Sequence, residues 1–243
     1  MAERKVQEAV ARSADDKVFR AVFDAVQAHR IAPGVKLREI ELVQLFHVSR
    51  ASVRTALKRL EHVGLVTIEP HRGATVRQLT PQDCRDLFEA RRAVEGAAVE
   101  LLAQSGKPTA IAALRAHAQA QKEAFEQGKQ QEGQHLAISF HSRLVELSGN
   151  RLLADIARDL LARMPLVVLT FGRSEPGDAH YAEHIELVEA IAAGNPARAR
   201  EILYSHLRHV QQEVETRRSQ RQPSLADMLL PRRPASAASL ADA

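Results

Sequence analysis

One stretch decides how this chain folds: VSRASVRTALKRL, residues Val48–Leu60. Its apolar residues recur at i, i+3, i+4 and i+7, which predicts a helix with one buried face. The apolar stripe consists of Val53, Ala56, Leu57 and Leu60. The opposite face carries small and basic residues, namely Ala51, Arg54, Thr55 and Lys58. Ser49 is suited to cap this helix, because its hydroxyl can accept a free backbone N–H of the first turn.

A shorter helix is predicted just before it, over residues 38–46, with a tight turn at His47-Val48. Two helices joined in this way, the second small and basic on its outer face, form a helix-turn-helix that can enter a major groove. Arg50 and Arg54 can then reach phosphates or pair with guanine. An ordinary amphipathic surface helix is the alternative that this stretch alone leaves open.

The flanking segments extend the pattern. Residues 15–30 read as a helix that ends at Pro33-Gly34. Residues 65–69 and 74–77 read as two strands of a small hairpin, the wing of a winged helix. The hairpin tip carries His71 and Arg72, which are placed to touch a phosphate or the minor groove, unless the tip is simply a solvated turn.

The length of the chain agrees with two domains. The charge distribution indicates that the first domain binds a polyanion. The chain has 243 residues and a formal net charge of +4. Residues 1–80 hold 14 Lys and Arg against 9 Asp and Glu, whereas residues 81–216 hold 15 against 19. A basic front before an acidic remainder favours nucleic acid as the partner of the front.

Several features predict a cytoplasmic protein that does not meet a membrane. The single Cys84 cannot form an internal disulfide, which suits a reducing compartment. The polar N-terminus lacks the apolar core of a signal peptide. The longest apolar run, Met164–Phe171, is far too short to span a bilayer.

From Pro81 onward the pattern is helical, so the predicted fold class is mainly α: a winged helix-turn-helix followed by an all-helical bundle. Thr80 is expected to cap the first helix of the bundle, with Pro81 at its first position. The bundle helices are predicted at 81–104, 109–127, 134–147, 151–171, 178–193 and 196–217, with a loop at 127–132. The predicted domains are a flexible arm at 1–14, the winged helix at 15–79, the bundle at 80–217 and a disordered tail at 218–243.

Four ordered segments of the front carry a family resemblance. They are Pro33-Gly34-x-x-Leu37-x-Glu39, Val48-Ser49-Arg50-x-x-Val53-Arg54-x-Ala56-Leu57-x-x-Leu60-Glu61, Gly64-Leu65-Val66 and Arg72-Gly73-Ala74-x-Val76. Together they resemble the DNA-binding domain of GntR-family bacterial transcription regulators. The resemblance implies that the following residues lie at the DNA: Ser49, Arg50, Arg54 and the wing-tip Gly73. The outer helix face and the wing add Ser52, Lys58, His71 and Arg72 to the expected DNA-binding set.

The sequence departs from the family pattern at two positions of the outer face. The family commonly has Pro where Ser52 stands and Glu where Thr55 stands. Base preference is therefore expected to differ from the commonest operators.

The bundle resembles the FCD effector domain of the FadR-like subfamily. The resemblance rests on Leu87-Phe88-Glu89-Ala90-Arg91 with Glu95, on Phe140-His141-x-x-Leu144 with Ser148-Gly149-Asn150, and on His184 and His206. It implies a site for a small-molecule effector and places Arg91 near the effector cavity, where a guanidinium can grip a carboxylate bidentately. An Arg91–Glu95 pair on a solvated face is the alternative.

Three histidines lie within apolar stripes of three separate predicted helices: His141, His184 and His206. Imidazoles that converge from three helices are good ligands for a divalent metal such as Zn, Ni or Mn. Three separately hydrogen-bonded core histidines are the alternative.

The resemblance implies a metal held by three His and one Asp, with the Asp one turn before the first His. Ala137 stands at that position. An effector carboxylate or water is then expected to complete the shell, while His135 lies on a different face and His180 is either a reserve ligand or a surface residue.

The function that these features predict is a ligand-responsive transcription regulator, expected to be a repressor, that binds double-stranded operator DNA as a homodimer. Two other classes stay open: a metal-dependent hydrolase that uses the three histidines, and a non-catalytic protein-interaction module. The sequence carries neither a nucleophile elbow nor an HExxH motif, which argues against the hydrolase. Arg50, Arg54 and Lys58 on one face argue against the interaction module.

Overall fold

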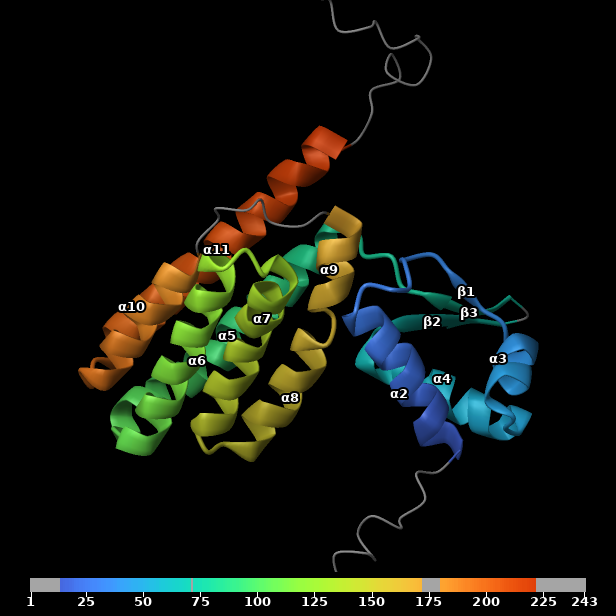
Figure 1. The fold of residues 1–243 in the computed structure, drawn as a ribbon, viewed down its shortest axis with the longest axis horizontal. Helices are drawn as coiled ribbons and strands as arrows, with labels where there is room; N and C mark the ends of the chain where they lie inside the picture. Colours follow the sequence, from blue (N-terminus) through green and yellow to red (C-terminus); the bar gives the residue numbers. More distant parts are fainter. Residues whose placement is uncertain (1–13, 71, 172–179, 222–243) are drawn as a thin grey trace, which may run out of the picture.

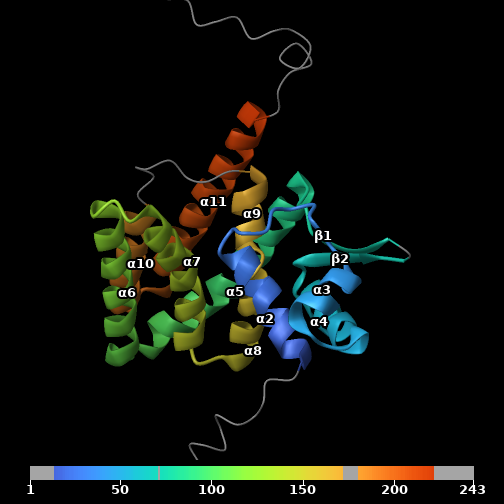
Figure 2. The same ribbon diagram turned by 45° about the vertical axis from the view of Figure 1, so that its right-hand side comes forward.

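The computed structural model describes residues 14–70, 72–171 and 180–221. Figure 1 shows two parts: a small winged-helix part with a sheet, and a helical bundle beside it. Helix α2 of the winged-helix part lies on the side that faces the bundle (Figures 1 and 2). The fold class predicted from the sequence is confirmed.

The winged-helix part holds the helix-turn-helix. Its helices are α2 (Ala14–Gln27), α3 (Glu39–Phe46) and α4 (Arg50–Val63). All four residues of the predicted apolar stripe of α4 are buried. Ser49 caps α4 by accepting the backbone N–H of Ser52 at 3.1 Å. The helix ends at Gly64, whose φ of 85° is a left-handed conformation that glycine adopts without strain.

The wing is a three-stranded sheet rather than a two-stranded hairpin. The strands are β1 (Lys36–Leu37), β2 (Val66–Glu69) and β3 (Gly73–Val76), in the order β1-β3-β2 with antiparallel pairing. Val66 pairs with Val76 and Glu69 with Gly73, as the predicted hairpin requires. Strand β1 was missed because two residues are too short to show an alternating pattern.

Within the described residues from Pro81 onward, seven helices form the bundle. They are α5 (Pro81–Ser105), α6 (Pro108–Glu126), α7 (Gln130–Leu147), α8 (Arg151–Leu161), α9 (Met164–Phe171), α10 (His180–Ala192) and α11 (Pro196–Arg221). Helix α5 begins with a capping box in which Thr80 and Asp83 satisfy each other's backbone N–H groups. The two longest helices, α5 and α11, pack along each other and form the spine of the bundle (Figure 1).

The prediction of one helix over 151–171 is wrong, because α8 ends at Leu161 and α9 begins at Met164. Pro165 explains the break, since it has no N–H to donate to the carbonyl of Leu161 four residues earlier. We call the turn formed by Ala162 and Arg163 the α8–α9 joint.

Two other boundaries also differ from the prediction. Helix α7 begins at Gln130, inside the predicted loop, because Gly133 is helical and leaves room for the ring of Phe125. Helix α11 continues to Arg221, so the predicted disordered tail is helical over residues 218–221. The rest of that tail and residues 1–13 of the predicted arm lie outside the described residues, whereas Ala14, the last residue of that arm, begins α2. Within the described ranges, no helix is both long enough and apolar enough to cross a membrane.

Candidate functional site

The outer face of α4 presents the basic side chains that the sequence singled out. Arg50, Arg54 and Lys58 are all exposed. Arg54 is held from the neighbouring helix, since its Nε donates to both carboxylate oxygens of Glu39 at 3.0 Å. This hydrogen bond to Glu39 raises the pKa of Arg54. An exposed ion pair of this kind is weak in water, so a base edge or phosphate can replace Glu39 as the acceptor.

The remaining residues of the predicted DNA-binding set lie at the start of α4 and in the wing. The hydroxyls of Ser49 and Ser52 lie 2.9 Å apart, so Ser52 supports the cap. Arg72 projects from the wing and pairs with Glu69 at 3.2 Å. Gly73 has a φ of 84°, which allows the tight turn into β3. His71 lies outside the described residues.

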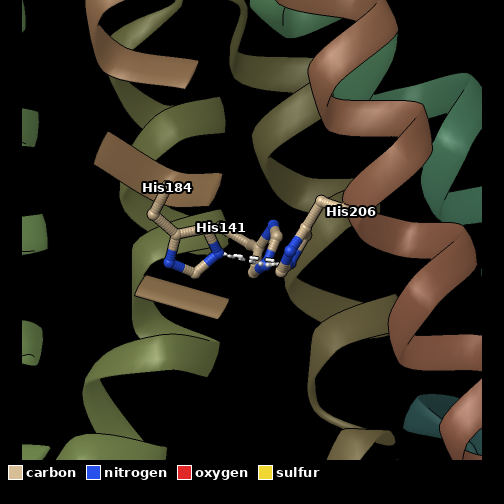
Figure 3. A group of neighbouring side chains, drawn as sticks. All are labelled: His141, His184 and His206. Atoms are coloured by element: carbon tan, nitrogen blue, oxygen red, sulfur yellow. Dashed lines mark hydrogen bonds between the residues drawn. The ribbon is translucent and has the colours of Figure 1, made fainter. Parts of the chain in front are cut away.

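The structure brings His141, His184 and His206 together from α7, α10 and α11 (Figure 3). Their Nε2 atoms form a nearly equilateral triangle with sides of 3.3, 3.2 and 3.2 Å. All three side chains are buried. A tetrahedral ion with metal–nitrogen bonds of about 2.0–2.1 Å holds neighbouring nitrogens about 3.3–3.4 Å apart. The triangle therefore has the size that a metal shell needs. We call these residues the histidine trio.

Each ring of the histidine trio is oriented by a different polar partner. Glu95, Gln121 and Glu183 each place an oxygen 2.7 Å from an Nδ1 atom, that of His141, His184 and His206 respectively. Carboxylate and amide oxygens only accept hydrogen bonds, so each Nδ1 carries the hydrogen. In the neutral ring the Nε2 lone pair is then free.

Three Nε2 lone pairs thus face one another inside the fold. A single proton can bridge only one pair of these nitrogens, whereas a cation is shared by all three. A ligating imidazole whose other nitrogen donates to a carboxylate or amide is the usual outer shell of a protein metal site.

The electrostatics keep the histidine trio neutral. Burial lowers the pKa of His184 well below the usual range, and the neighbouring His206 and His141 lower it further. Burial also lowers the pKa of His206, to about 4. For His141, burial outweighs the opposing effect of Glu95 and the pKa is again lowered. Neutral imidazoles are the form that binds metal, so the trio is ready for an ion at pH 7.

Glu95 links the histidine trio to Arg91. One oxygen of Glu95 accepts from His141, and the other accepts from Nε of Arg91 at 2.6 Å. Burial raises the pKa of Glu95, but Arg91 and His141 outweigh burial and hold it at about 2. Glu95 is therefore a charged carboxylate inside the bundle.

Arg91 is buried, so the alternative of an Arg–Glu pair on a solvated face is wrong. Its Nη1 lies 3.3 Å from the sulfur of Met164. Its Nη2 is buried and has no hydrogen-bond partner among the described residues. A buried charged donor without an acceptor is costly unless a ligand supplies one.

A cavity of about 1120 Å³ lies beside these groups. The histidine trio, Arg91 and Ala137 all contribute to its lining. Ala137 lies one turn before His141 on α7, so no side-chain carboxylate occupies the position that the family resemblance gives to Asp. His135 also lines the cavity, although its side chain is exposed.

His180 approaches the histidine trio from the start of α10. Its Nδ1 lies 3.2 Å from Glu183 and its Nε2 lies 3.0 Å from Glu213. His180, Glu183 and His206 form a second group whose ligand atoms lie close together. Because both nitrogens of His180 face carboxylates, its side chain orients Glu183 rather than joining the triangle.

The cavity also touches the winged-helix part. Gln27 of α2 lines the cavity and donates from Nε2 to the carbonyl of Ala162 at 3.0 Å. Arg163 donates from Nε to the carbonyl of Val63 at 2.8 Å. The α8–α9 joint is thus bonded to α2 on one side and to the end of α4 on the other.

The sequence predicted that the three histidines converge, but it did not reveal most of the residues that orient their rings. Glu95 was noted only as a neighbour of Arg91, one turn away. Gln121 and Arg163 gave no signal, because each acts across helices that are distant in sequence. Glu183 could have been suspected from its place beside His184.

Comparisons with known proteins agree with this architecture. A family model described as "FCD domain" matches residues 86–209, and one described as "Bacterial regulatory proteins, gntR family" matches residues 14–76. The HTH-type transcriptional repressor RspR of Escherichia coli is 26% identical over 201 residues, which cover 82% of this chain and 88% of the relative. The "Probable D-xylose utilization operon transcriptional repressor" of Paenarthrobacter nicotinovorans is 30% identical over 179 residues, 73% of this chain and 78% of the relative. A solved GntR-type transcriptional regulator from Rhodococcus sp. RHA1 aligns with a TM-score of 0.73 at 25% identity, covering 84% of this chain and 98% of that one.

Proposed function

The chain belongs to the GntR family of bacterial transcription regulators and carries an FCD domain, and we propose that it binds operator DNA as a homodimer and changes its affinity when a small acid enters the bundle. The observation that carries the ligand-responsive part is the histidine trio with its Nδ1 atoms all engaged. The relatives named as transcriptional repressors support repression as the mode of action.

The DNA-binding part of the proposal rests on the exposed basic face of α4. Arg50 and Arg54 lie in the first half of α4, which is proposed to face the groove, and Lys58 lies one turn further on, where it is proposed to meet a phosphate. One short recognition helix reads too few bases to select a site in a genome. A two-fold dimer contacts two half-sites and so doubles the number of base pairs that are recognised. We therefore propose a near-palindromic operator.

The histidine trio is proposed to hold a divalent metal, with Zn, Ni and Mn as the candidates. The triangle has the right size, the rings are neutral, and Glu95, Gln121 and Glu183 fix the ring orientations. When bound, the ion supplies a positive charge at the wall of the cavity. Because Ala137 provides no carboxylate, that charge attracts an anion from solution.

The anion is proposed to be the carboxylate of the effector. Nη2 of Arg91 is a buried donor that lacks an acceptor among the described residues, and Arg91 lines the same cavity as the histidine trio. A carboxylate beside the trio supplies that acceptor. Glu95 then balances the charge of Arg91 from the opposite side.

The response to the ligand is proposed to be a population shift. Met164, directly after the α8–α9 joint, contacts Arg91, and the joint is bonded to the ends of α2 and α4. A ligand that prefers one position of the joint therefore favours one position of the recognition helix, and with it one spacing of the two winged helices in the dimer.

The histidine trio is proposed to bind a ligand rather than to catalyse a reaction. Glu95 and Glu183, the described carboxylates that contact the histidine trio, each accept a hydrogen bond from an Nδ1 atom. Both are thereby used as orienting groups, and neither is placed as a general base toward the cavity. Turnover of ester and amide substrates by metal-loaded protein would support the hydrolase instead.

The proposal is tested by selecting duplexes from a random pool with the full chain and measuring affinity by fluorescence anisotropy. We expect a near-palindromic consensus, two chains per duplex and an affinity that falls steeply with salt. Binding of one chain per duplex would contradict the dimer, and failure to enrich any duplex sequence would contradict operator binding.

A further inference from the structure

The cavity beside the histidine trio is shared between the two parts of the molecule. On one side it is lined by the trio and Arg91, and on another by α2 of the winged-helix part. The residues on this side are Phe23, Asp24 and Gln27 of α2, together with Ala28 and His29 directly after the helix. A ligand held at the trio therefore has free space that leads to a helix of the DNA-binding part.

The cavity also has an apolar wall beside the polar groups of the trio and Arg91. The polar groups that suit a carboxylate, the histidine trio and Arg91, are buried together at one place. Much of the wall beyond them is apolar and comes from α7, α8, α9 and α11. Its residues include Ile138, Leu161, Met164, Pro165, Val168 and Val210.

The size of the cavity exceeds what a small acid needs. Its volume of about 1120 Å³ is at or above the upper end of the roughly 300–1,000 Å³ that is usual for pockets holding drug-sized ligands. An acid of two or three carbons held at the trio would leave most of the apolar wall without a partner. Burial of an apolar ligand body against that wall is favourable in proportion to its area.

We propose that the effector is an amphipathic carboxylic acid whose head lies at the histidine trio and Arg91 and whose apolar body extends to Phe23 of α2. The position of the head rests on the proposed function. The apolar body and its contact with α2 rest on the shape and lining of the cavity.

Phe23 is the residue that contacts the apolar end of this ligand. It is partly buried and stacks on Phe19 with ring centroids 5.6 Å apart. Val18, Val22 and Val26 of the same helix are buried in the core that α2 shares with α4. A ligand that presses on Phe23 therefore acts on the helix against which the recognition helix packs.

Phe19 provides a matched control. It has the same side chain, lies one turn earlier on α2 and does not belong to the cavity lining. Its ring faces Arg59 instead, with the guanidinium carbon 4.2 Å from the ring centroid. Loss of Phe19 disturbs α2 without removing a wall of the cavity.

The experiment measures the binding of straight-chain acids to the zinc-loaded full chain by calorimetry, using acetate, butanoate, hexanoate and octanoate below their aggregation concentrations. We expect the dissociation constant to fall about fourfold for each added methylene, the size of the hydrophobic gain per buried CH₂. Phe23→Ala should weaken octanoate about tenfold and leave acetate unchanged. Phe23→Leu should restore much of the loss, and Phe19→Ala, which removes the ring stacked on Phe23 but no wall of the cavity, should weaken octanoate far less than Phe23→Ala does.

The outcomes separate this inference from the proposed function. If acetate binds only when zinc is present and Arg91 is unsubstituted, but affinity does not rise from acetate to octanoate, the inference is overturned. The proposed head-group site then stays intact. A gain that survives Phe23→Ala would also overturn the inference, because the chain would then run elsewhere. If none of the acids binds to zinc-loaded protein, the carboxylate site itself is wrong and both proposals fail.

Discussion

Arg163 donates its Nε–H to the main-chain carbonyl of Val63 across 2.8 Å, so the α8–α9 joint holds the last turn of the recognition helix. The carbonyls of a helix's last turn lack partners within the helix, and a cation beside them is favourable. The guanidinium also lies against Gly64, where a side-chain Cβ would come within 2.5 Å of Nε. Arg163 of the bundle therefore contacts the C-terminal end of the recognition helix α4 directly.

Arg163→Ala should loosen the position of the recognition helix relative to the bundle. If the wild type binds as the proposed dimer, it should lose about tenfold or more in affinity when one base pair is inserted between the half-sites, since misplaced contacts each cost roughly 1–3 kcal/mol. The variant should tolerate the insertion with a smaller loss. Anisotropy titrations with the two duplexes provide the comparison.

Arg143→Ala is the control for this change, because Arg143 is exposed and, among the described residues, forms an ion pair with its neighbour Glu146 alone. It should keep the wild-type spacing preference. Equal spacing preferences in Arg163→Ala and the wild type would show that the joint does not position the helix.

Arg54 and Lys58 should contribute to DNA binding in different ways. Arg54→Ala should cost about 1–3 kcal/mol and relax specificity at one operator position, as loss of a base contact does. Lys58→Ala should weaken all duplexes alike and lower the salt slope by about one unit, as loss of a phosphate contact does. Unchanged operator affinity in both variants would place the reading surface elsewhere.

Much of the fold was predictable from local pattern. The stripe of α4, its Ser49 cap and the Thr80 cap of α5 are local features, and each has a direct chemical cause in the sequence. The break after Leu161 was missed although Pro165 was visible, because apolar periodicity continues across the joint. Strand β1 is formed by pairing with β3, which no pattern within Lys36–Leu37 reveals.

The convergence of the histidine trio was predictable, but its orientation was not. Periodicity placed each histidine on an apolar face, and three such faces must share one core. Which nitrogen faces inward depends on Glu95, Gln121 and Glu183, which reach the rings from α5, α6 and α10. Contacts across helices of this kind follow from packing geometry, not from sequence spacing.

Ala137→Asp should tighten metal binding at the histidine trio. The new carboxylate would lie one turn before His141 and supply both a fourth ligand and a compensating negative charge. Zinc affinity, measured by competition with a chromophoric chelator, should rise by about tenfold or more. Ala137→Asn, which adds the same volume without the charge, should give a smaller gain. An equal or weaker affinity in Ala137→Asp would mean that position 137 does not face the ion.

The metal-free protein should lose stability as pH falls from 6.5 toward 4. An unfolded histidine takes up its proton near pH 6.5, whereas native His206 does so only near 4, and the pKa values of His141 and His184 are also lowered. Between these values the unfolded chain binds more protons, so the free energy of unfolding decreases with decreasing pH. The raised pKa of His180 acts in the opposite direction, but its contribution is complete below pH 6.5.

Urea unfolding of metal-free protein at pH 7.5, 6.0 and 5.0 measures this dependence. His184→Gln should reduce it, because one of the three depressed titrations is removed. Stability that stays constant or rises between pH 6.5 and 5.0 in the wild type would contradict neutral, buried imidazoles at the histidine trio.

The most direct test of the account is a calorimetric titration of metal-free protein with Zn²⁺, carried out in parallel on the wild type and on His184→Ala. We predict one ion per chain for the wild type, with release of few protons at pH 7 because the proposed ligands are already neutral. In His184→Ala we predict loss of this binding with operator affinity retained. Absence of binding in the wild type, or the same isotherm in both proteins, would contradict a metal centre at His141, His184 and His206.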